Sequence, residues 1–211
     1  MTGVFITLEG GDGVGKSTQS ALLRVWLEER GQEVVPTREP GGTDLGAEIR
    51  EIVLHRRGHI APRAEALLYA ADRAHHVDAV VRPALERGAV VLQDRYLDSS
   101  VAYQGAGRVL DPTEIRSLSL WAAEGLLPHL TVLLDLDQAS ARTRLDAART
   151  RFDRLESERA EFHERVRQAF LALADAEPDR FLVVDASLPR EEIAERIRAR
   201  VAALLDGGAS A

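Results

Sequence analysis

The sequence predicts an α/β protein in which a parallel sheet carries helices on both faces. Short apolar runs alternate with segments of helical spacing along the 211-residue chain, which is the order expected of a doubly wound sheet. In addition, a glycine-rich segment follows the first apolar run directly and precedes a helical pattern, a position typical of phosphate-binding loops.

The predicted strands are short runs with few charges. The runs at 89–93 and 130–136 are close to continuously apolar, which is typical of parallel strands covered on both faces. A segment with helical spacing separates each run from the next, as parallel strands require. The five predicted strands are Val4–Leu8, Glu33–Pro36, Ala89–Gln93, Leu130–Leu136 and Arg180–Val184.

The predicted helices have recognisable ends. The first ends at Gly31, a C-cap signal, and another begins after Asp111, a good N-cap that is followed by proline in the first turn. The predicted helices are Gln19–Arg30, Ala64–Arg87 with an interruption around Pro83, Pro112–Gly125, Leu155–Glu177 and Pro189–Leu205.

Length and composition favour a single domain, because 45% of the residues are hydrophobic and can form a sizeable core. We expect this domain to cover residues 1–206, followed by a flexible tail at 207–211. An arginine-rich segment at about 142–154 is a candidate lid, although such charge runs are usually solvated helix faces.

Charge and cysteine content exclude several classes of protein. The net charge of −7 argues against a nucleic-acid-binding protein, which usually has a basic face. The sequence contains no cysteine, and therefore no disulfide or thiolate metal site. No segment resembles a signal peptide or approaches the ~20 apolar residues of a membrane span. We therefore expect a cytoplasmic protein that binds neither nucleic acid nor membrane.

Residues 10–17 read GGDGVGKS and match the phosphate-binding motif G-x-x-x-x-G-K-[ST]. Glycine permits backbone angles that a Cβ atom would forbid, so that successive N–H groups can converge on phosphate oxygens. Lys16 is expected to reach the β- and γ-phosphates, and the Ser17 hydroxyl to bind Mg²⁺. The flanking strand and helix favour a true phosphate site over a chance match, and hence a P-loop NTPase three-layer fold. The predicted ATP-binding residues are Gly10, Gly11, Asp12, Gly13, Val14, Gly15, Lys16, Ser17 and Thr18.

The phosphate-binding motif does not by itself name a function, because GTPases, motor ATPases, transporters and small-molecule kinases all contain it. The guanine-specifying motif N-K-x-D is absent, which argues against a GTPase. The chain is also short for a motor or transporter domain. Its small size and arginine-rich segment favour a kinase with a closing lid.

A second polar cluster lies in the segment 92–105, which reads LQDRYLDSSVAYQG. Asp94 ends a predicted strand, at the point where P-loop proteins place a carboxylate near Mg²⁺. Arg95 follows it and is expected to point into the ligand crevice of a doubly wound sheet. On these two residues alone, a structural Asp–Arg pair is an equally good interpretation.

The same segment resembles the thymidylate kinase signature, D-R-Y-x-x-S-S-x-A-Y-Q-G. The resemblance covers nearly the whole chain, because TREPGGTDLGAEIR at 37–50, LLYAADRAHH at 67–76 and ARTRFDRLE at 148–156 match in the same order. It implies a kinase that transfers the γ-phosphoryl of ATP, bound with Mg²⁺, to dTMP for dTTP synthesis. It also implies a homodimer.

The resemblance assigns roles around the thymine base and the sugar. Tyr69 matches an aromatic residue that stacks on thymine, and Arg73 matches an arginine that donates to a thymine carbonyl. Ser100 and Gln104 lie where side chains approach the base edge. Tyr103 matches a tyrosine packed against C2′ of the sugar. By pattern alone, the two tyrosines are more often core residues and Arg73 a surface residue.

It also assigns roles around the acceptor phosphate. Asp12 matches a carboxylate near the sugar 3′-hydroxyl. Arg38, Arg50 and Arg95 match arginines that hold or approach the acceptor phosphate, for which the guanidinium fork is suited. The bond before Pro40, which is expected to contact substrate, matches a turn that can be cis. By pattern alone, Arg50 is more often a surface residue.

Several other residues carry no predicted function. His76 shows no metal-ligand spacing and is interpreted as a surface or near-site bystander. Asp135 ends a predicted strand, where a structural role is favoured over binding magnesium. Glu9 precedes the phosphate-binding motif without a definable role. Trp121 lies in an apolar helix and is interpreted as a core or subunit-interface residue.

Two other functions remain open at this stage. One is a P-loop kinase that acts on a different nucleotide or on a nucleoside, which a panel of acceptors would reveal. The other is a non-catalytic, ATP-binding regulatory protein, which would bind ATP without acceptor-dependent turnover.

The lid is expected to supply catalytic arginines, in addition to Lys16 and Arg95. Some thymidylate kinases carry an arginine in the P-loop, where this chain has Gly13, and those with a small residue there resemble the bacterial type with lid arginines. The attacking phosphate oxygen is already ionised, so catalysis requires positioning and charge stabilisation rather than a general base. We hypothesise that Arg149 or Arg151 provides the charge.

Replacing Arg149 and Arg151 individually with alanine is expected to lower kcat at least about tenfold in one of the two variants. The reason is that a charge-stabilising arginine contributes ~10³–10⁵ in rate to phosphoryl transfer. ADP release at saturating substrates measures the effect. An unchanged kcat in both variants would exclude the lid arginines from catalysis.

Overall fold

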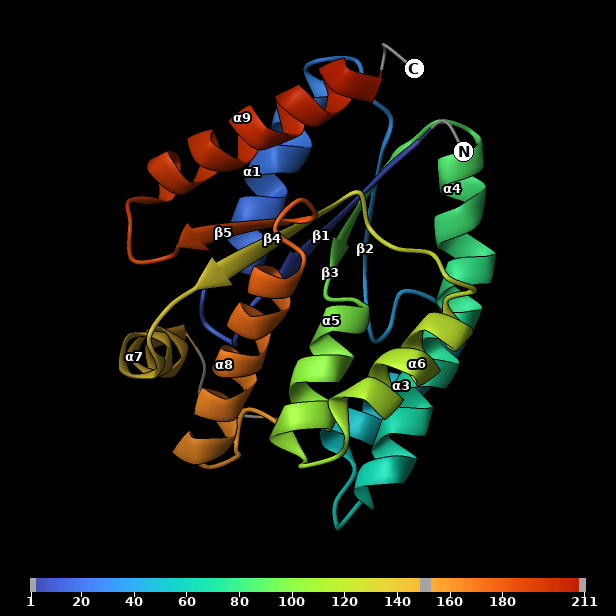
Figure 1. The fold of residues 1–211 in the computed structure, drawn as a ribbon, viewed down its shortest axis with the longest axis vertical. Coiled ribbons are helices and arrows are strands. Elements are labelled where there is room, and N and C mark those ends of the chain that lie inside the picture. Colours follow the sequence, from blue (N-terminus) through green and yellow to red (C-terminus); the bar gives the residue numbers. More distant parts are fainter. Residues whose placement is uncertain (1–2, 149–152, 209–211) are drawn as a thin grey trace.

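A computed structural model describes residues 3–148 and 153–208 and has the predicted three-layer α/β architecture (Figure 1). Its five strands form one parallel sheet in the order β2-β3-β1-β4-β5. Each predicted strand is present within two residues of its expected bounds. The strands are β1 (Val4–Glu9), β2 (Val34–Arg38), β3 (Val90–Asp94), β4 (Leu130–Asp135) and β5 (Phe181–Asp185).

The two faces of the sheet bury different side chains, because successive residues of a strand point to opposite sides. On one face, Ile6 and Leu8 of β1 belong to a core cluster with residues of α1 (Lys16–Glu28) and α9 (Arg190–Gly208). On the other face, Phe5 packs into a cluster with residues around α4 (Arg82–Glu86). Figure 1 shows α1 and α9 together on one side of the sheet. On the other side lie α3 (Pro62–His76), α5 (Leu97–Ser100), α6 (Pro112–Ala122) and α8 (Ala160–Ala176).

Some helices differ from the prediction. The long helix expected over 64–87 consists of α3 (Pro62–His76), a π-helical stretch at 77–81 and α4. The helix expected from Leu155 begins only at Ala160, because the Asp153 carboxylate accepts hydrogen bonds from the main-chain N–H groups of the next residues and forms a turn.

Five helical segments of the described residues were not predicted, one of which is a π-helical stretch at Glu51–His55. The short helix α2 (Asp44–Arg50) is capped by the Thr43 hydroxyl, which accepts from the Gly46 N–H group. The segment after β3 coils as α5 (Leu97–Ser100) and continues as a π-helical stretch, Val101–Gly107. The fifth segment, α7 (Gln138–Ala148), covers the first half of the predicted lid.

The strand register determines where polar groups gather. Leu8 of β1 and Arg38 of β2 both lie opposite Asp94, the last residue of β3. The carboxyl ends of these three strands therefore meet at one edge of the sheet, at a switch point of the doubly wound fold. This edge carries the phosphate-binding motif after β1 and Arg95 after β3.

Trp121, interpreted from the sequence as a core or subunit-interface residue, lies on the outer surface. Trp121 on α6 (Pro112–Ala122) has an exposed fraction of 78%, so its assignment to the core is wrong. The residues that α6 buries are Ile115, Ser119 and Ala122. Within residues 3–148 and 153–208, no helix has the length and apolarity that a membrane crossing requires.

Candidate active site

The phosphate-binding loop curves around the side chain of Lys16. Its Nζ atom donates to the main-chain oxygens of Gly10, at 3.1 Å, and Gly11, at 2.5 Å. Burial, followed by the positive charge of Arg95, lowers the pKa of Lys16 to about 8. Lys16 also begins α1, whose N-terminus carries a positive dipole end. The loop therefore presents a charge and a helix terminus to the same anion.

Two glycines of this loop approach neighbouring backbone closely. Gly13 has a φ of 81°, and a Cβ atom there would lie 2.5 Å from the carbonyl oxygen of Ala141 in α7. Gly10 has a φ of 128°, and its Cβ would lie 2.4 Å from the carbonyl oxygen of Leu134 in β4. Any side chain at position 13, an arginine included, would require the loop or α7 to move.

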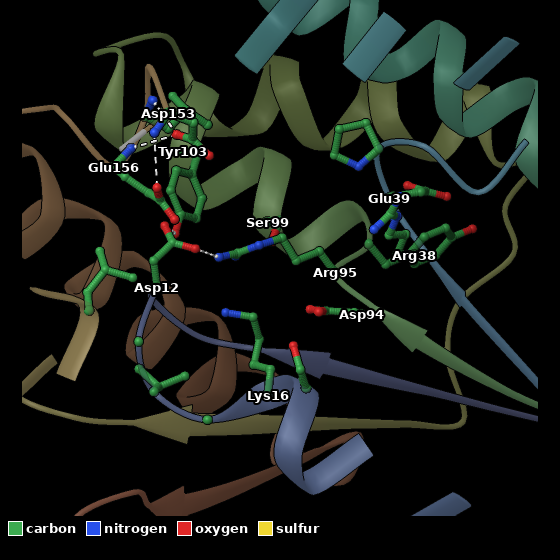
Figure 2. A pocket seen from close by; sticks show the side chains of 18 of the residues that line it. Asp12, Lys16, Arg38, Glu39, Asp94, Arg95, Ser99, Tyr103, Asp153 and Glu156 are labelled. Atoms are coloured by element: carbon green, nitrogen blue, oxygen red, sulfur yellow. Dashed lines mark hydrogen bonds and ion pairs between the residues drawn. The ribbon is translucent and has the colours of Figure 1, made fainter. Parts of the chain in front are cut away.

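Arg95, Asp12 and Tyr103 form the centre of the site (Figure 2). The Arg95 guanidinium donates to Asp12 Oδ1 at 2.6 Å and to the Gly10 carbonyl at 3.0 Å. The Tyr103 hydroxyl donates to the other carboxylate oxygen of Asp12 at 3.2 Å. Burial alone would raise the pKa of Asp12, but Arg95 and Lys16 outweigh it and lower the pKa. Asp12 is therefore ionised and oriented by two partners.

Asp94 lies beside this centre and has a buried oxygen, Oδ1, that accepts no hydrogen bond within the described residues. An unpartnered carboxylate oxygen next to a phosphate-binding loop fits a divalent cation. The described part of the chain contains no group of three or more His, Cys, Asp and Glu residues arranged for a metal. This donor set suits Mg²⁺, which often takes one or two protein carboxylates and completes its octahedron with water and substrate phosphates.

One cavity of about 660 Å³ connects these groups with the predicted acceptor residues. Gly10 and Gly11 line a smaller neighbouring cavity of about 220 Å³. Arg149 and Arg151 lie outside the described residues. The large cavity is lined, among others, by Asp12, Gly13, Val14, Gly15, Lys16, Ser17, Thr18, Arg38, Pro40, Arg50, Tyr69, Arg73, Asp94, Arg95, Ser100, Tyr103 and Gln104.

Arg38 and Arg50 give one wall of the cavity a positive charge. Neither forms an ion pair with a carboxylate in the part of the chain that the structure describes, although Arg50 donates to the Pro40 carbonyl at 2.9 Å. Burial and then the charge of Arg38 lower the pKa of Arg50. The bond between Glu39 and Pro40 is cis, as the sequence resemblance suggested. Closely spaced guanidinium groups outside such ion pairs make a site for an anion.

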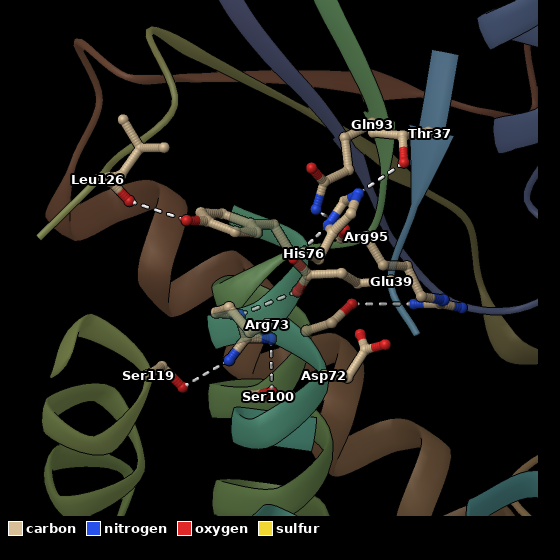
Figure 3. A network of polar contacts seen from close by, with 12 residues as sticks. Thr37, Glu39, Asp72, Arg73, His76, Gln93, Arg95, Ser100, Ser119 and Leu126 are labelled. Atoms are coloured by element: carbon tan, nitrogen blue, oxygen red, sulfur yellow. Dashed lines mark hydrogen bonds and ion pairs between the residues drawn. The ribbon is translucent and has the colours of Figure 1, made fainter. Parts of the chain in front are cut away.

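Arg73 is buried, with an exposed fraction of 1%, so the pattern-based expectation of a surface residue is wrong. Its Nε donates to Glu39 at 3.0 Å, and its two terminal nitrogens donate to Ser119 and Ser100, each at 3.0 Å (Figure 3). A guanidinium has five N–H donors. Two donors of Arg73 therefore remain for a ligand, while the other three hold its plane in a defined orientation.

His76 is also fully buried, so its interpretation as a surface residue is wrong. Its ring nitrogens contact Glu39 at 2.9 Å and Thr37 at 2.6 Å. Burial, followed by the charge of Glu39, raises the pKa of the neighbouring Asp72 to about 6. The sequence did contain a signal for this buried polar cluster. From Tyr69 onward, polar residues recur at the spacing i, i+3, i+4, i+7, which puts Asp72, Arg73 and His76 on one helix face.

The side-chain amide of Gln104, which lines the cavity, is held by a buried carboxylate. The amide donates to Glu65 at 2.9 Å, and the same carboxylate pairs with Arg108 and Arg154. Arg154 also donates to the carbonyl of Val53 at 2.9 Å. Arg154, which follows the predicted catalytic lid arginines, is therefore committed to structural contacts.

Comparisons with known proteins show the family of this chain. The family model described as Thymidylate kinase matches residues 8–197. The chain belongs to the thymidylate kinase family. It is 85% identical to the thymidylate kinase of Clavibacter michiganensis subsp. michiganensis over the full length of both chains. It is 54% identical to that of Deinococcus radiodurans, over 94% of this chain and 96% of the relative.

A solved structure gives the same result. The crystal structure of thymidylate kinase from Ehrlichia chaffeensis superposes with a TM-score of 0.77 at 30% identity, covering 95% of this chain and 99% of the other. Asp135 has the structural role that the sequence favoured, because both of its carboxylate oxygens accept from Arg167, at 2.7 and 2.9 Å.

Substituting Gly13 with alanine is expected to weaken ATP binding about tenfold and to lower the melting temperature. Alanine adds left-handed backbone strain of roughly 1–2 kcal/mol and a 2.5 Å approach to Ala141. Calorimetric titration with ATP and thermal unfolding measure the two effects. Gly58→Ala is the matched control, because Gly58 has a φ of 97° but nothing within 4 Å of its Cβ position. Equal effects of both substitutions would contradict the packing argument.

Proposed function

We propose that this protein phosphorylates dTMP with ATP, producing dTDP and ADP in the cytoplasm as a step in dTTP synthesis. The observation that supports this most directly is the single cavity of about 660 Å³. The phosphate-binding loop lies at one end of it. At the other end lie Arg38 and Arg50, which form no ion pair within the described residues, and the buried Arg73. Family membership supports the same reaction.

On the donor side, the loop residues 10–18 cradle the phosphates of ATP and Lys16 contacts the β- and γ-phosphates. Mg²⁺ would be held by the Ser17 hydroxyl and the unpartnered Asp94 oxygen. When bound, it neutralises charge on the transferred phosphoryl group. A polyphosphate also offsets the burial that lowers the pKa of Lys16, so the lysine is protonated in the complex.

On the acceptor side, Arg38, Arg50 and Arg95 bind the phosphate of dTMP. Its oxygen attacks the γ-phosphorus without a general base, since it is already ionised. The main barrier is repulsion between two anions, which the arginines and Lys16 reduce. Arg149 or Arg151 adds charge from the lid.

The nucleoside lies between Asp12 and α3. Asp12 accepts from the 3′-hydroxyl, and the Tyr103 ring fills the space that a ribose 2′-hydroxyl would need. Tyr69 stacks on thymine, and burial raises its pKa, so it stays a neutral phenol. Arg73 directs its two remaining N–H donors to a thymine carbonyl, with Ser100 and Gln104 at the base edge.

We also propose that the protein is a homodimer that uses the outer face of α3 and α6. Leu67 on α3 has an exposed fraction of 58% and Trp121 on α6 of 78%, and these two helices pack against each other. Large exposed apolar side chains on adjacent helices are typical of a contact surface.

In a panel of dTMP, dUMP, dCMP, CMP and thymidine, we expect the highest kcat/KM for dTMP. The preference over dUMP should be roughly 10–200-fold, the range that one methyl group provides in a fitted pocket. Coupled ADP release measures it, and Lys16→Ala serves as an inactive control. A higher kcat/KM with another nucleotide or with the nucleoside would refute the dTMP assignment. ATP binding without acceptor-dependent turnover would indicate a non-catalytic protein.

Replacing Trp121 with glutamate should convert the dimer to a monomer, because a charge cannot be buried at an apolar contact without a partner. Light scattering after size-exclusion chromatography measures the mass. Val25→Glu is the control, since Val25 is 53% exposed on α1, on the opposite face of the sheet. A wild-type mass of one chain, or a dimeric Trp121→Glu variant, would exclude this interface.

A further inference from the structure

Glu9 is a buried carboxyl group that the proposed reaction does not use. It is the last residue of β1 and directly precedes the phosphate-binding loop. Its exposed fraction is 0%, and it does not line the large cavity. A group in this position cannot touch substrate, so any part in the reaction must act through its neighbours.

Within the described residues, the hydrogen-bond partners of Glu9 follow β3 directly, at Tyr96 and in α5. Its Oε1 atom accepts from the main-chain N–H groups of Tyr96, at 2.7 Å, and Ser99, at 3.3 Å. Its Oε2 atom accepts from the Ser99 hydroxyl at 2.6 Å. Ser99 Oγ in turn accepts from the Arg95 guanidinium at 3.2 Å. The carboxylate thus fixes the direction of the Ser99 hydroxyl, so that a lone pair faces Arg95.

The backbone of Arg95 depends on the same contacts. Its φ is 66°, in the left-handed region that a residue with a side chain adopts only when its surroundings impose it. Its N–H donates to the Leu8 carbonyl at 3.0 Å, and its carbonyl accepts from the Gln93 amide at 2.9 Å. The next N–H group, that of Tyr96, is held by Glu9. Figure 3 shows Arg95 with Gln93 at the end of β3.

We propose that Glu9 is a positioning residue that aims the Arg95 guanidinium at the acceptor phosphate, through the Tyr96 amide and the Ser99 hydroxyl. This inference rests on the proposed function, in which Arg95 binds that phosphate. It adds a residue that touches neither substrate.

A purely stabilising role fits the electrostatics of Glu9 poorly. Burial, and then the charge of Asp98, raise the pKa of Glu9 to about 7, although Arg95 and the bonds from Ser99 and Tyr96 oppose the shift. A carboxyl whose folded pKa is raised contributes stability at low pH and loses it as the pH rises through about 7. The ionised group therefore disfavours folding at pH 8, where a neutral glutamine should fold at least as well.

The test compares Glu9→Gln, Ser99→Ala and the double variant in the full-length protein at pH 8. Glutamine can still accept from Tyr96, but its Nε2 donates to Ser99 Oγ and competes with Arg95. We expect kcat/KM for dTMP to fall at least about tenfold, since small misplacements of a reacting group have effects of this size. KM for ATP should stay within about twofold and the melting temperature should not fall. Adding Ser99→Ala to Glu9→Gln should lower kcat/KM little further, because both substitutions disrupt the same hydrogen bonds from Glu9 through Ser99 to Arg95.

Thr7→Val is the matched control. Thr7 is a fully buried polar residue of the same strand, and its hydroxyl is hydrogen-bonded to that of Thr131 at 3.0 Å rather than to the Arg95 turn. The kcat/KM of the Thr7→Val variant should therefore stay within about twofold of wild type. A Glu9→Gln enzyme with unchanged kcat/KM, or additive single effects, would overturn the positioning role. Wild-type turnover of dTMP in the same assay tests the proposed function separately. If the wild-type protein does not turn over dTMP, the inference is tested by calorimetric titration with dTMP. Equal affinities of the wild-type protein and the Glu9→Gln variant would then overturn it.

Discussion

The ion pair between Arg95 and Asp12 joins the two halves of the site, and the surrounding arrangement depends on it. Asp12 belongs to the loop after β1, and Arg95 belongs to the turn after β3. The parallel register brings the two strand ends together. Tyr103 then binds the second oxygen of Asp12, and Lys16 lies within the loop that carries it. Donor and acceptor groups are thereby fixed relative to each other before any ligand binds.

Concentrating cations at one edge of a sheet has an electrostatic cost, and the fold divides the arginines into two groups. Arg73 is buried and pairs with Glu39, and the partly buried Arg154 pairs with Glu65. Arg38 and Arg50 line the cavity without a carboxylate partner among the described residues. The first group gives the walls a defined shape, because buried ion pairs with additional hydrogen bonds are rigid. The second group keeps its charge available for an anion.

Close packing of the loop residue Gly13 against α7 couples the phosphate cradle to the start of the lid. A side chain at Gly13 would collide with the Ala141 carbonyl, so this chain has no room for a charge at that point of the loop. The same contact places the helix that leads toward residues 149–152 directly over the phosphate-binding loop.

The sequence by itself determined the five strands, the phosphate-binding loop and the approximate positions of the longer helices α1, α3, α6, α8 and α9, because these depend on local periodicity and on a contiguous motif. The acceptor residues that line the cavity were named from the family motifs. Only the tertiary structure decided the partners of the buried polar groups. It buried Arg73 and His76, exposed Trp121, and connected Glu9 to a turn 87 residues away. The short helices α2 and α5 were also missed, since too few turns exist to show a period. Partners separated by 34 or 87 positions leave no local pattern, because the sheet register and helix packing bring them together.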